Sequence, residues 1–524
     1  MSTAPIRRRD LLRYGAVGLG AALLPLGLQR IVGVSDRQVA GLVVRQAGGG
    51  DFAARSPAVT HFDVAYQVKD LKPEVMPRSG YDATTDYYDV SMHEATADIL
   101  PNLKTPIWGY NGKFPGQTIE AYKDRKAVVT FRNNLPAGFD GLTIHHHGGI
   151  QRPEFDGYPL DLTYDSRSYP TLIQPGHSWT YEYPNPNSAC TNWYHDHAYG
   201  KTSQHVYRGL AGFFLIRDDM EHQFNLPKDE YELPLLFQNR RFDSTGALVF
   251  NDNEHSGVVG DVQLVNGKPW PRLQVAARKY RFRLLNGSNW RRYFFTLSNG
   301  RPIIQIGTES GFLRAPLNLP MIQLYQGERA DVVVDFGGLA VGTKVILQNR
   351  SDEAIGTPMG EVMLFEVTST VTDDSQVPVI LDNTWTDLST PQAVASATVR
   401  RIFEFDDSNG FWVINGRTFN KDRFDANPRY GTTEIWEFGG GSGWYHPIHL
   451  HLIDFQVLSR DGNPVRPWER GRKDTVALAE GDTASVIINF DPKKFFFTGP
   501  YLMHCHNIDH EDHDMMTQYN MLAV

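Results

Sequence analysis

Histidines occur in four short clusters along this chain of 524 residues. Ten of the 18 histidines lie in the clusters, which are His145-His146-His147, His195-Asp196-His197, His446-Pro447-Ile448-His449-Leu450-His451 and His504-Cys505-His506. In a β-strand, residues i and i+2 project from the same face, so each H-x-H pair presents two imidazoles together. One such pair is more often a surface accident or a pair of hydrogen-bonded core histidines. Four pairs predict a compact metal cluster built on strands.

The rest of the chain has the pattern of a mostly β protein. Short alternating runs rich in Val, Ile, Thr and aromatic residues are broken by Gly, Pro, Asn and Asp, and long amphipathic helices are scarce. These runs include Ala127 to Asn133, Ala211 to Arg217, Tyr280 to Asn286, Ala330 to Phe336 and Thr433 to Phe438. We predict antiparallel strands at these positions.

A weak internal repeat divides the chain into three units. The turn dipeptide Asn-Gly, which favours positive φ, occurs at Asn111, Asn266 and Asn415, and these positions are 155 and 149 residues apart. Domains of roughly 150 residues are common, so the length of the chain also suggests about three domains. The predicted β-sandwich domains span residues 46–220, 221–372 and 399–524, with a linker rich in Thr, Ser and Asp at 373–398.

The histidine clusters occupy matching positions in the first and third units. His145 and His446 follow their Asn-Gly turns by 34 and 31 residues, and His195 and His504 follow theirs by 84 and 89 residues. The corresponding stretches of the middle unit, near residues 293–298 and 347–352, contain no histidine. We therefore expect the first and third units to build the metal cluster at their shared interface, with the middle unit as a spacer or a wall.

Cys505 is the central residue of an H-C-H cluster, so its sulfur is expected on the strand face opposite the two flanking histidines. There it can meet His446 and His510, with Met515 as a weak axial ligand. Two imidazoles, one thiolate and a distant thioether form the ligand set of a blue copper site, whereas zinc prefers a closed site of four ligands. A disulfide with Cys190 would remove the thiolate, so we expect Cys190 to be a small buried apolar residue.

At these residues the chain resembles the multicopper oxidases, most closely their bacterial laccase and bilirubin oxidase branch, which includes the spore-coat laccases. The resemblance rests on the motifs I-H-H-H-G, W-Y-H-D-H, H-P-I-H-L-H and H-C-H-N-I-D-H-E-D-H-D-M, and it covers nearly all of the chain beyond the N-terminus. It implies an all-β fold of three cupredoxin-like Greek-key β-sandwich or barrel domains. It also implies four copper ions, of which one is type 1, one is type 2 and two are type 3.

The resemblance assigns a residue of this chain to every copper ligand by its position in these motifs. The type 1 ligands are His446, Cys505, His510 and Met515, and the type 2 ligands are His145 and His449. The two type 3 ions are assigned to His147, His195 and His506 and to His197, His451 and His504. His146 and His513 lie outside this set, and we expect His146 to pack against its neighbours and His513 to be solvated.

Two acidic residues also match the family pattern. Asp156, in E-F-D-G-Y-P, and Glu511, directly after His510, resemble the carboxylates that assist proton delivery during oxygen reduction. A positioned acid suits this chemistry because dioxygen must gain four protons as well as four electrons. The alternative is that both are ordinary loop carboxylates or groups that orient a histidine.

The function implied by the resemblance is that of a laccase-type oxidoreductase. Such an enzyme oxidises phenols, aminophenols, aromatic amines or bilirubin-like tetrapyrroles by single electrons and reduces dioxygen to water. A metal oxidase acting on Cu(I), Mn(II) or Fe(II) is an alternative, although the 11 methionines form no Met-rich insert suited to Cu(I). A copper-free exported structural protein is a third alternative, and the complete ligand set argues against it. A nitrite reductase of the two-domain type would need fewer histidines.

The N-terminus has the pattern of a twin-arginine export signal. Arg7-Arg8-Arg9-Asp10 precedes a weakly apolar run that ends near Leu28, so residues 1–45 are predicted to be the signal and a flexible N-terminus. We expect the twin-arginine machinery as a partner and a periplasmic, cell-surface or extracellular location. Beyond the signal, no run of 18 apolar residues predicts a membrane span. The formal net charge of −9 argues against nucleic acid as a partner, because phosphate binding needs a basic surface.

Overall fold

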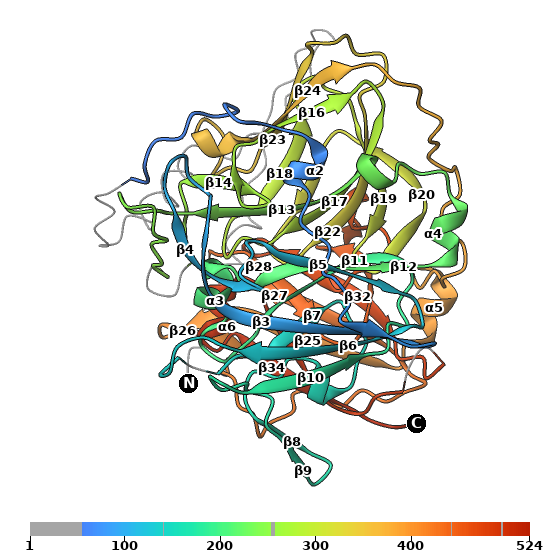
Figure 1. Ribbon diagram of the computed structural model, residues 1–524. Coiled ribbons are helices and arrows are strands. Elements are labelled where there is room, and N and C mark those ends of the chain that lie inside the picture. Colours follow the sequence, from blue (N-terminus) through green and yellow to red (C-terminus); the bar gives the residue numbers. More distant parts are fainter. Residues whose placement is uncertain (1–54, 140, 253–256, 442, 494–495) are drawn as a thin grey trace, which may run out of the picture. The chain divides into compact units, whose positions relative to one another are not determined.

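The structure, a computed structural model, describes residues 55–139, 141–252, 257–441, 443–493 and 496–524 (Figure 1). Apart from a short strand at residues 65–66, its six larger sheets collect strands from three successive stretches of the chain, two sheets to a stretch. The predicted all-β fold of three cupredoxin-like sandwiches is therefore confirmed, while the exact domain boundaries stay a prediction. The predicted signal at residues 1–45 lies outside the described residues. Among the described helices, none is long and apolar enough to span a membrane.

The first sandwich consists of two sheets that enclose a core of Tyr88, Phe131, Ile119 and Phe214. One sheet contains β10 (Ser178–Tyr183), β6 (Lys126–Asn133), β3 (Thr85–Ala97) and β2 (Gly80–Tyr81) in that order, with β4 (Thr105–Tyr110) paired to β3. The other contains β5 (Gly116–Tyr122), β12 (Ala211–Arg217), β11 (Cys190–Asp196) and β7 (Ile144–His147). The connections carry the hairpin β8 (Leu162–Tyr164) and β9 (Arg167–Tyr169) and the helices α3 (Thr202–Arg208) and α4 (Asp219–Gln223) (Figure 1).

The middle sandwich has the largest core cluster, in which Leu235 and Phe282 pack with Val345 and Phe365. Its first sheet contains β1 (Ala65–Tyr66), β16 (Arg272–Ala276), β24 (Glu361–Ser369), β23 (Lys344–Asn349), β18 (Tyr293–Leu297) and β21 (Ile322–Leu324). The second contains β15 (Lys268–Pro269), β14 (Val262–Val265), β13 (Glu232–Arg240), β17 (Lys279–Asn286), β22 (Arg329–Asp335), β19 (Ile303–Thr308) and β20 (Gly311–Leu319). Strand β1 and helix α2 (Val68–Leu71) precede the first sandwich in the chain, yet β1 pairs with β16 of the middle one.

The third sandwich packs Trp436, Phe438 and Val486 of one sheet with Ile448 and Tyr501 of the other. The first sheet contains β26 (Phe411–Ile414), β25 (Val399–Ser408), β27 (Thr433–Gly440), β32 (Thr483–Asn489), β29 (Gln456–Arg460) and β30 (Asn463–Pro464). The second contains β31 (Thr475–Leu478), β28 (His446–Leu450), β33 (Gly499–Cys505) and β34 (Met516–Met521). Helix α5 (Pro391–Ser396) precedes these sheets, and α6 (Ile508–Asp512) connects β33 to β34.

The three predicted Asn-Gly turns adopt the same conformation. Asn111, Asn266 and Asn415 have φ of 52°, 49° and 52°, and the glycine that follows each also has positive φ. In every turn the Asn side-chain oxygen accepts a backbone N–H from a preceding strand, at 2.9, 2.8 and 2.8 Å. Positive φ at both central residues is the requirement that selects Asn-Gly. The weak sequence repeat therefore corresponds to a repeated structural element.

A buried ionic cluster joins the first sandwich to the middle one. Glu221 of α4 accepts hydrogen bonds from Arg281 at 2.7 Å and from Arg283 at 2.5 Å, both on β17. Burial alone would raise the pKa of Glu221, but Arg281, Arg283 and Arg217 outweigh this effect and lower the pKa to about 2. Removing one partner from a buried cluster leaves an uncompensated charge, so the contact of Glu221 with Arg281 and Arg283 is expected to contribute strongly to stability.

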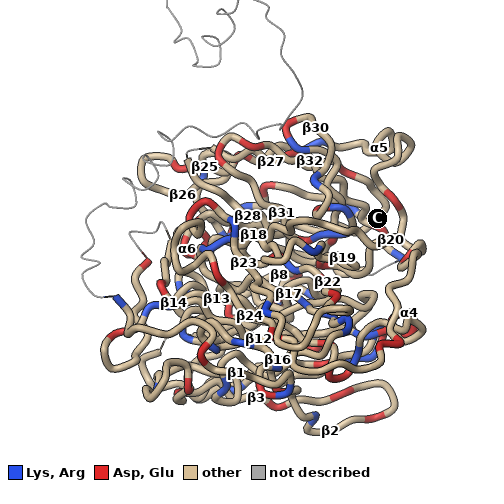
Figure 2. The backbone as a smooth tube through the Cα atoms, turned by 90° about the horizontal axis from the view of Figure 1, so that it is seen from above, with Lys and Arg blue, Asp and Glu red and all other residues tan. Residues whose placement is uncertain are grey.

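Elsewhere along the chain Lys and Arg are interspersed with Asp and Glu (Figure 2).

Replacing Glu221 with glutamine is expected to lower the free energy of unfolding by about 3 kcal/mol at pH 7. Because the folded pKa is depressed, the contribution is present above the ordinary value of 4.5 and is lost as the pH falls toward 2. Urea unfolding of both proteins from pH 7 to pH 2 should show the difference shrinking across that window. Glu182→Gln, which removes an exposed pair with Lys126, should cost less than about 1 kcal/mol. An equal difference for Glu221→Gln at pH 7 and pH 2 would contradict the explanation.

Candidate metal centre

The pairing of strands brings the four histidine clusters together. His145 on β7 lies opposite His195 on β11, and His449 on β28 lies opposite His504 on β33. The two strand pairs meet across the boundary between the first and third sandwiches, where Nε2 of His145 is 3.2 Å from Nε2 of His449. All ten predicted histidine ligands are buried. The expected interface between the first and third units is therefore the place where the clusters converge.

One predicted type 3 set and the predicted type 2 pair are tightly gathered. Nε2 of His504 lies 3.3 Å from Nε2 of His197 and 3.2 Å from Nε2 of His451. The type 2 candidates, His145 and His449, face each other through Nε2 as described above. Each of these arrangements presents nitrogen atoms to a common point.

The second predicted type 3 set is more open. The ring centroids of His147, His195 and His506 are 5.0 to 5.9 Å apart. The donor atoms of His147 and His195 lie within 4.8 Å of a donor atom of His145, which was predicted to bind the type 2 ion. The eight histidines thus form one cluster, while the assignment of each to an individual ion stays a prediction.

The hydrogen bonds of the cluster leave imidazole lone pairs facing one another, an arrangement that a bound cation would stabilise. Nδ1 of His145 donates to the Asp156 carbonyl at 2.7 Å, and Nδ1 of His449 donates to the Asp474 carbonyl at 2.9 Å. Burial is the main cause that lowers the pKa of both rings well below the ordinary value, and neighbouring imidazoles lower it further. Each ring is therefore neutral. Their Nε2 lone pairs therefore face each other at 3.2 Å, which is repulsive without a cation between them. Nε2 of His195 and both ring nitrogens of His506 are also buried without a hydrogen-bond partner among the described residues.

A second donor set lies on the opposite face of β33. Sγ of Cys505 is 3.6 Å from Nδ1 of His446 and 3.7 Å from Nδ1 of His510, and these two nitrogens are 3.3 Å apart. Met515 is buried, and its backbone donates to the His510 carbonyl and accepts from the Cys505 amide. Burial raises the pKa of the Cys505 thiol well above its ordinary value, so the thiolate requires a nearby cation. His446, Cys505 and His510 thus form a donor set that fits copper, while ligation by the Met515 sulfur stays a prediction.

The two predicted acidic residues both contact ligand histidines. The Asp156 carboxylate accepts from Nδ1 of His451 at 2.7 Å, and that of Glu511 lies 3.0 Å from Nδ1 of His504. Burial raises the pKa of Asp156 well above its ordinary value despite a hydrogen bond from Gln151. Burial would also raise the pKa of Glu511, but the imidazoles of His504 and His197 outweigh it and lower the pKa. The Asp156 carboxylate orients His451 by a hydrogen bond, which was the alternative to proton delivery. Glu511 lies close to Nδ1 of His504, while this nitrogen also lies 3.1 Å from the Cys505 carbonyl.

Three residues near the cluster were missed by the sequence reasoning. Asp474 is buried, its Oδ1 lies 3.3 Å from Nε2 of His147, and its carbonyl holds His449. Arg329 of the middle sandwich binds both carboxylate oxygens of Asp474. Asp196 accepts from the Thr143 and Ala198 amides and from His205, so it fixes the turn between the histidines on either side of it. The sequence feature that could have drawn attention to Asp474 is the charged pair Lys473-Asp474 directly before an otherwise apolar strand.

The residues left outside the ligand set have ordinary surroundings. His146 is buried and stacks on Phe214 with ring centroids 3.9 Å apart, as the packing interpretation required. Cys190 is buried in the core of the first sandwich, and neither it nor Cys505 forms a disulfide. His513 is partly exposed, and its Nδ1 lies 2.6 Å from the Asp509 carbonyl, so it is less solvated than expected.

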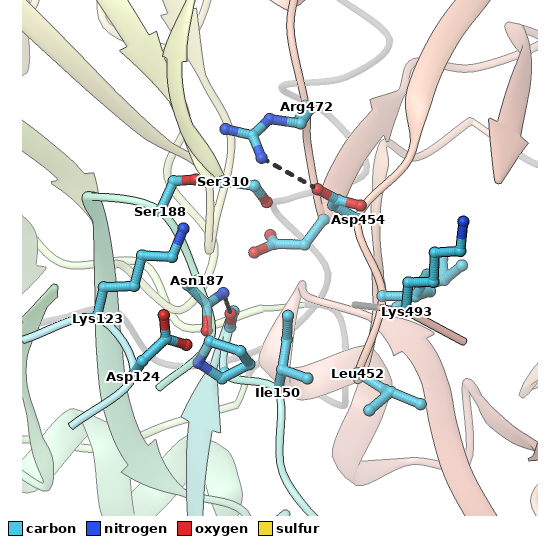
Figure 3. A pocket seen from close by; sticks show the side chains of 16 residues that line it. Lys123, Asp124, Ile150, Asn187, Ser188, Ser310, Leu452, Asp454, Arg472 and Lys493 are labelled. Carbon is cyan, nitrogen blue, oxygen red and sulfur yellow. Dashed lines mark hydrogen bonds and ion pairs between the residues drawn. The ribbon is translucent and has the colours of Figure 1, made fainter. Parts of the chain in front are cut away.

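A cavity of about 320 Å³ opens between the sandwiches and ends beside the cluster (Figure 3). Lys123 and Asp124 line it from the first sandwich, and Lys493 and Asp454 line it from the third. Asp474 also lines this cavity and contacts His147 and His449, so it connects the cavity to the histidine cluster.

Known proteins share both the sequence and the fold. The family description "Multicopper oxidase" matches residues 91–221 and 391–522. A bilirubin oxidase from Albifimbria verrucaria is 36% identical over 463 residues, with 84% of this chain and 77% of that protein covered. The chain belongs to the multicopper oxidase family. It is therefore an oxidoreductase, and the family implies copper at the donor sets described above.

Two further multicopper oxidase relatives extend the comparison. A laccase from Bacillus stratosphericus is 33% identical over 516 residues, with 86% of this chain and 98% of that protein covered. The crystal structure of a laccase from Pediococcus acidilactici superposes with a TM-score of 0.78 at 27% identity and covers 90% of this chain and 95% of that one. The resemblance to the laccase and bilirubin oxidase branch is thus confirmed.

Proposed function

We propose that this multicopper oxidase is of laccase type. It removes single electrons from phenols, aminophenols, aromatic amines or bilirubin-like tetrapyrroles and reduces dioxygen to two waters. Four phenols lose four electrons and four protons, which balance the four electrons and four protons that dioxygen gains. The observation that carries the proposal is the H-C-H cluster, in which Cys505 faces one donor set while His504 and His506 face the other.

The two donor sets are proposed to hold four copper ions. Copper, when bound, supplies one-electron redox chemistry at a type 1 site and multi-electron reduction of dioxygen at one type 2 and two type 3 ions. The backbone between Cys505 and its two neighbours is the covalent path that joins the donor sets. The chain itself fixes the His145 and His449 imidazoles by their Nδ1 atoms and keeps the cluster buried.

Protons are proposed to reach the cluster through Asp156 and Glu511. Their pKa values are displaced in opposite directions, upward for Asp156 and downward for Glu511. A pair of carboxylates shifted apart in this way suits one proton donor and one proton acceptor. Each lies within hydrogen-bond reach of a ligand histidine, so neither needs a large movement.

Oxygen consumption by the copper-loaded protein tests the proposal. With 2,6-dimethoxyphenol as the reductant, we expect one dioxygen consumed for every four phenols and no peroxide released. Parallel assays with bilirubin, Cu(I) and Mn(II) distinguish the laccase type from a metal oxidase. A protein that binds copper but turns over only the metal ions would overturn the substrate proposal. One that binds fewer than about four copper ions per chain would overturn the copper assignment.

Electrons are expected to enter the type 1 site through Trp412. Both type 1 histidines are buried, and the indole of Trp412 stacks on His510 with ring centroids 3.7 Å apart and an interplanar angle of 25°. Trp444 meets the same histidine edge-on at 5.8 Å. Trp412 is 8% exposed and His510 is fully buried, so the indole lies between this histidine and solvent on our proposal.

Replacing Trp412 with leucine should therefore slow the reduction of the type 1 site by a phenol about tenfold, or about 1.4 kcal/mol in the barrier. Stopped-flow measurement without oxygen, following the loss of blue colour, gives this rate. Trp412→Phe keeps an aromatic ring and should recover most of it. An unchanged rate in Trp412→Leu at an unchanged type 1 potential would show that electrons enter elsewhere.

A further inference from the structure

Two adjacent, oppositely charged residues of the middle sandwich meet two adjacent residues of the third sandwich in the reverse charge order. Nζ of Lys473 lies 3.2 Å from Oε1 of Glu328. Arg329 donates from Nη1 to Oδ1 of Asp474 at 2.7 Å and from Nη2 to Oδ2 at 2.6 Å. All four side chains are almost completely buried. Lys473 has a second buried partner, because its Nζ also lies 2.6 Å from Oε1 of Glu309. Loss of Arg329, in contrast, would leave the buried Asp474 carboxylate without its guanidinium partner.

Arg329 contacts all three sandwiches. Its backbone belongs to β22 of the middle sandwich, and the two Nη atoms of its guanidinium donate to the Asp474 carboxylate of the third sandwich. Its Nε donates to the carbonyl of Thr191, on β11 of the first sandwich, at 2.9 Å. Thr191 lies four residues before His195 on the same strand. A single guanidinium thus connects β11, which carries His195, to Asp474, which lies directly before β31, the strand paired with the His449 strand β28.

Asp474 transmits this arrangement to the histidines. Its carbonyl accepts from Nδ1 of His449 at 2.9 Å, and its Oδ1 lies 3.3 Å from Nε2 of His147. The next residue, Thr475, is paired with His449 across β31 and β28. The orientation of His449, and with it the Nε2 atom that faces His145, therefore depends on where Asp474 is held.

We infer that Arg329 is a positioning residue for the trinuclear site and acts through Asp474. The inference rests on the proposed function, because it concerns the same copper cluster. A guanidinium fork fixes both oxygens of a carboxylate in one plane, which a lysine ammonium cannot do. Asp474 also lines the cavity of Figure 3, so without the fork its carboxylate can turn away from His147 into that cavity. The middle sandwich is thus more than the spacer or wall that its lack of histidines suggested.

Arg329→Lys and Arg329→Gln, prepared as full-length copper-loaded proteins, test the inference. We expect the affinity for type 2 copper to fall about 10- to 100-fold, as is typical when the partner of a metal ligand is lost. The hyperfine splitting of the type 2 signal in electron paramagnetic resonance should change, and copper per chain should fall after dialysis against a chelator. The visible type 1 band and its reduction by phenol without oxygen should stay as in the wild type.

Arg281→Lys is the matched control. Arg281 is also buried in the middle sandwich, and its guanidinium donates hydrogen bonds to Asp331 and Glu221, away from the histidines. It should lower the melting temperature as the Arg329 variants do and leave the type 2 signal unchanged. If Arg329→Gln does not fold, Asp474→Asn and Arg329→Lys provide the same comparison.

Two results separate the possible failures. An unchanged type 2 signal and copper content in the Arg329 variants, or an equal change in Arg281→Lys, would overturn the positioning role while the wild type remains an active oxidase. A wild-type protein that shows no type 2 copper and no phenol oxidation would instead overturn the proposed function on which the inference rests.

Discussion

Replacing Cys505 with serine is expected to bleach the copper-loaded protein. The intense visible absorption of a type 1 site comes from the thiolate, and the Cys505 sulfur is the thiol that meets His446 and His510. A serine hydroxyl is a poor ligand for copper, and the path from the type 1 site to the H-C-H neighbours is lost with it. Phenol oxidation should fall by more than the roughly 100-fold typical of losing an outer partner of a ligand. Absorption near the blue band and oxygen consumption measure the two effects.

Cys190→Ser is the control for this experiment. Cys190 is also buried, but it lies on β11 in the core of the first sandwich, where its Sγ contacts the side chain of Asn192. The variant should remain blue and active with somewhat lower stability. Copper at the trinuclear cluster should remain in Cys505→Ser, since its donor nitrogens lie on the opposite face of β33. A Cys505→Ser protein that kept the visible band would remove the type 1 assignment.

The period of two residues in a strand was sufficient to predict much of the metal centre. It placed the histidines of each H-x-H pair on one face and Cys505 on the other, and the structure has both features. The predicted strands at Ala211 to Arg217 and near residues 280–286 agree in position with β12 and β17 within one residue at either end. They were predicted to be antiparallel, yet each pairs parallel with one neighbour, β12 with β5 and β17 with β13. The strand faces and positions follow from local geometry and from hydrophobic alternation, which a single sequence displays.

Contacts between sandwiches could not be predicted in the same way. Asp474, Arg329 and Trp412 act through partners more than 90 residues away, and no spacing pattern links them. A lone Asp or Arg in an apolar strand signals a buried pair, but the partner depends on how two sheets pack. The looser set of His147, His195 and His506 depends on the same packing.

The position of Asp156 explains why its role and that of Glu511 need separate tests. Asp156 contacts the cluster twice, through its carbonyl to His145 and through its carboxylate to His451, so any change there also disturbs orientation. Glu511 contacts His504 by its carboxylate alone at 3.0 Å. A glutamine at this position still offers an oxygen to Nδ1 of His504, but it cannot carry a proton. Glu511 is therefore the residue at which proton delivery can be separated from orientation.

Glu511→Gln is expected to lower the rate of oxygen reduction about 100-fold, the contribution of a positioned general acid or base. Reduction of the type 1 site by phenol without oxygen should stay at the wild-type rate, because Glu511 lies on the cluster side of β33. Stopped-flow reduction, steady-state oxygen consumption and the solvent isotope effect on each separate the two steps. Asp512→Asn is the neighbouring control, since its carboxylate accepts from the Thr202 and Ser203 amides of α3. Full activity in Glu511→Gln combined with loss of activity in Glu511→Ala would leave Glu511 only the role of holding His504.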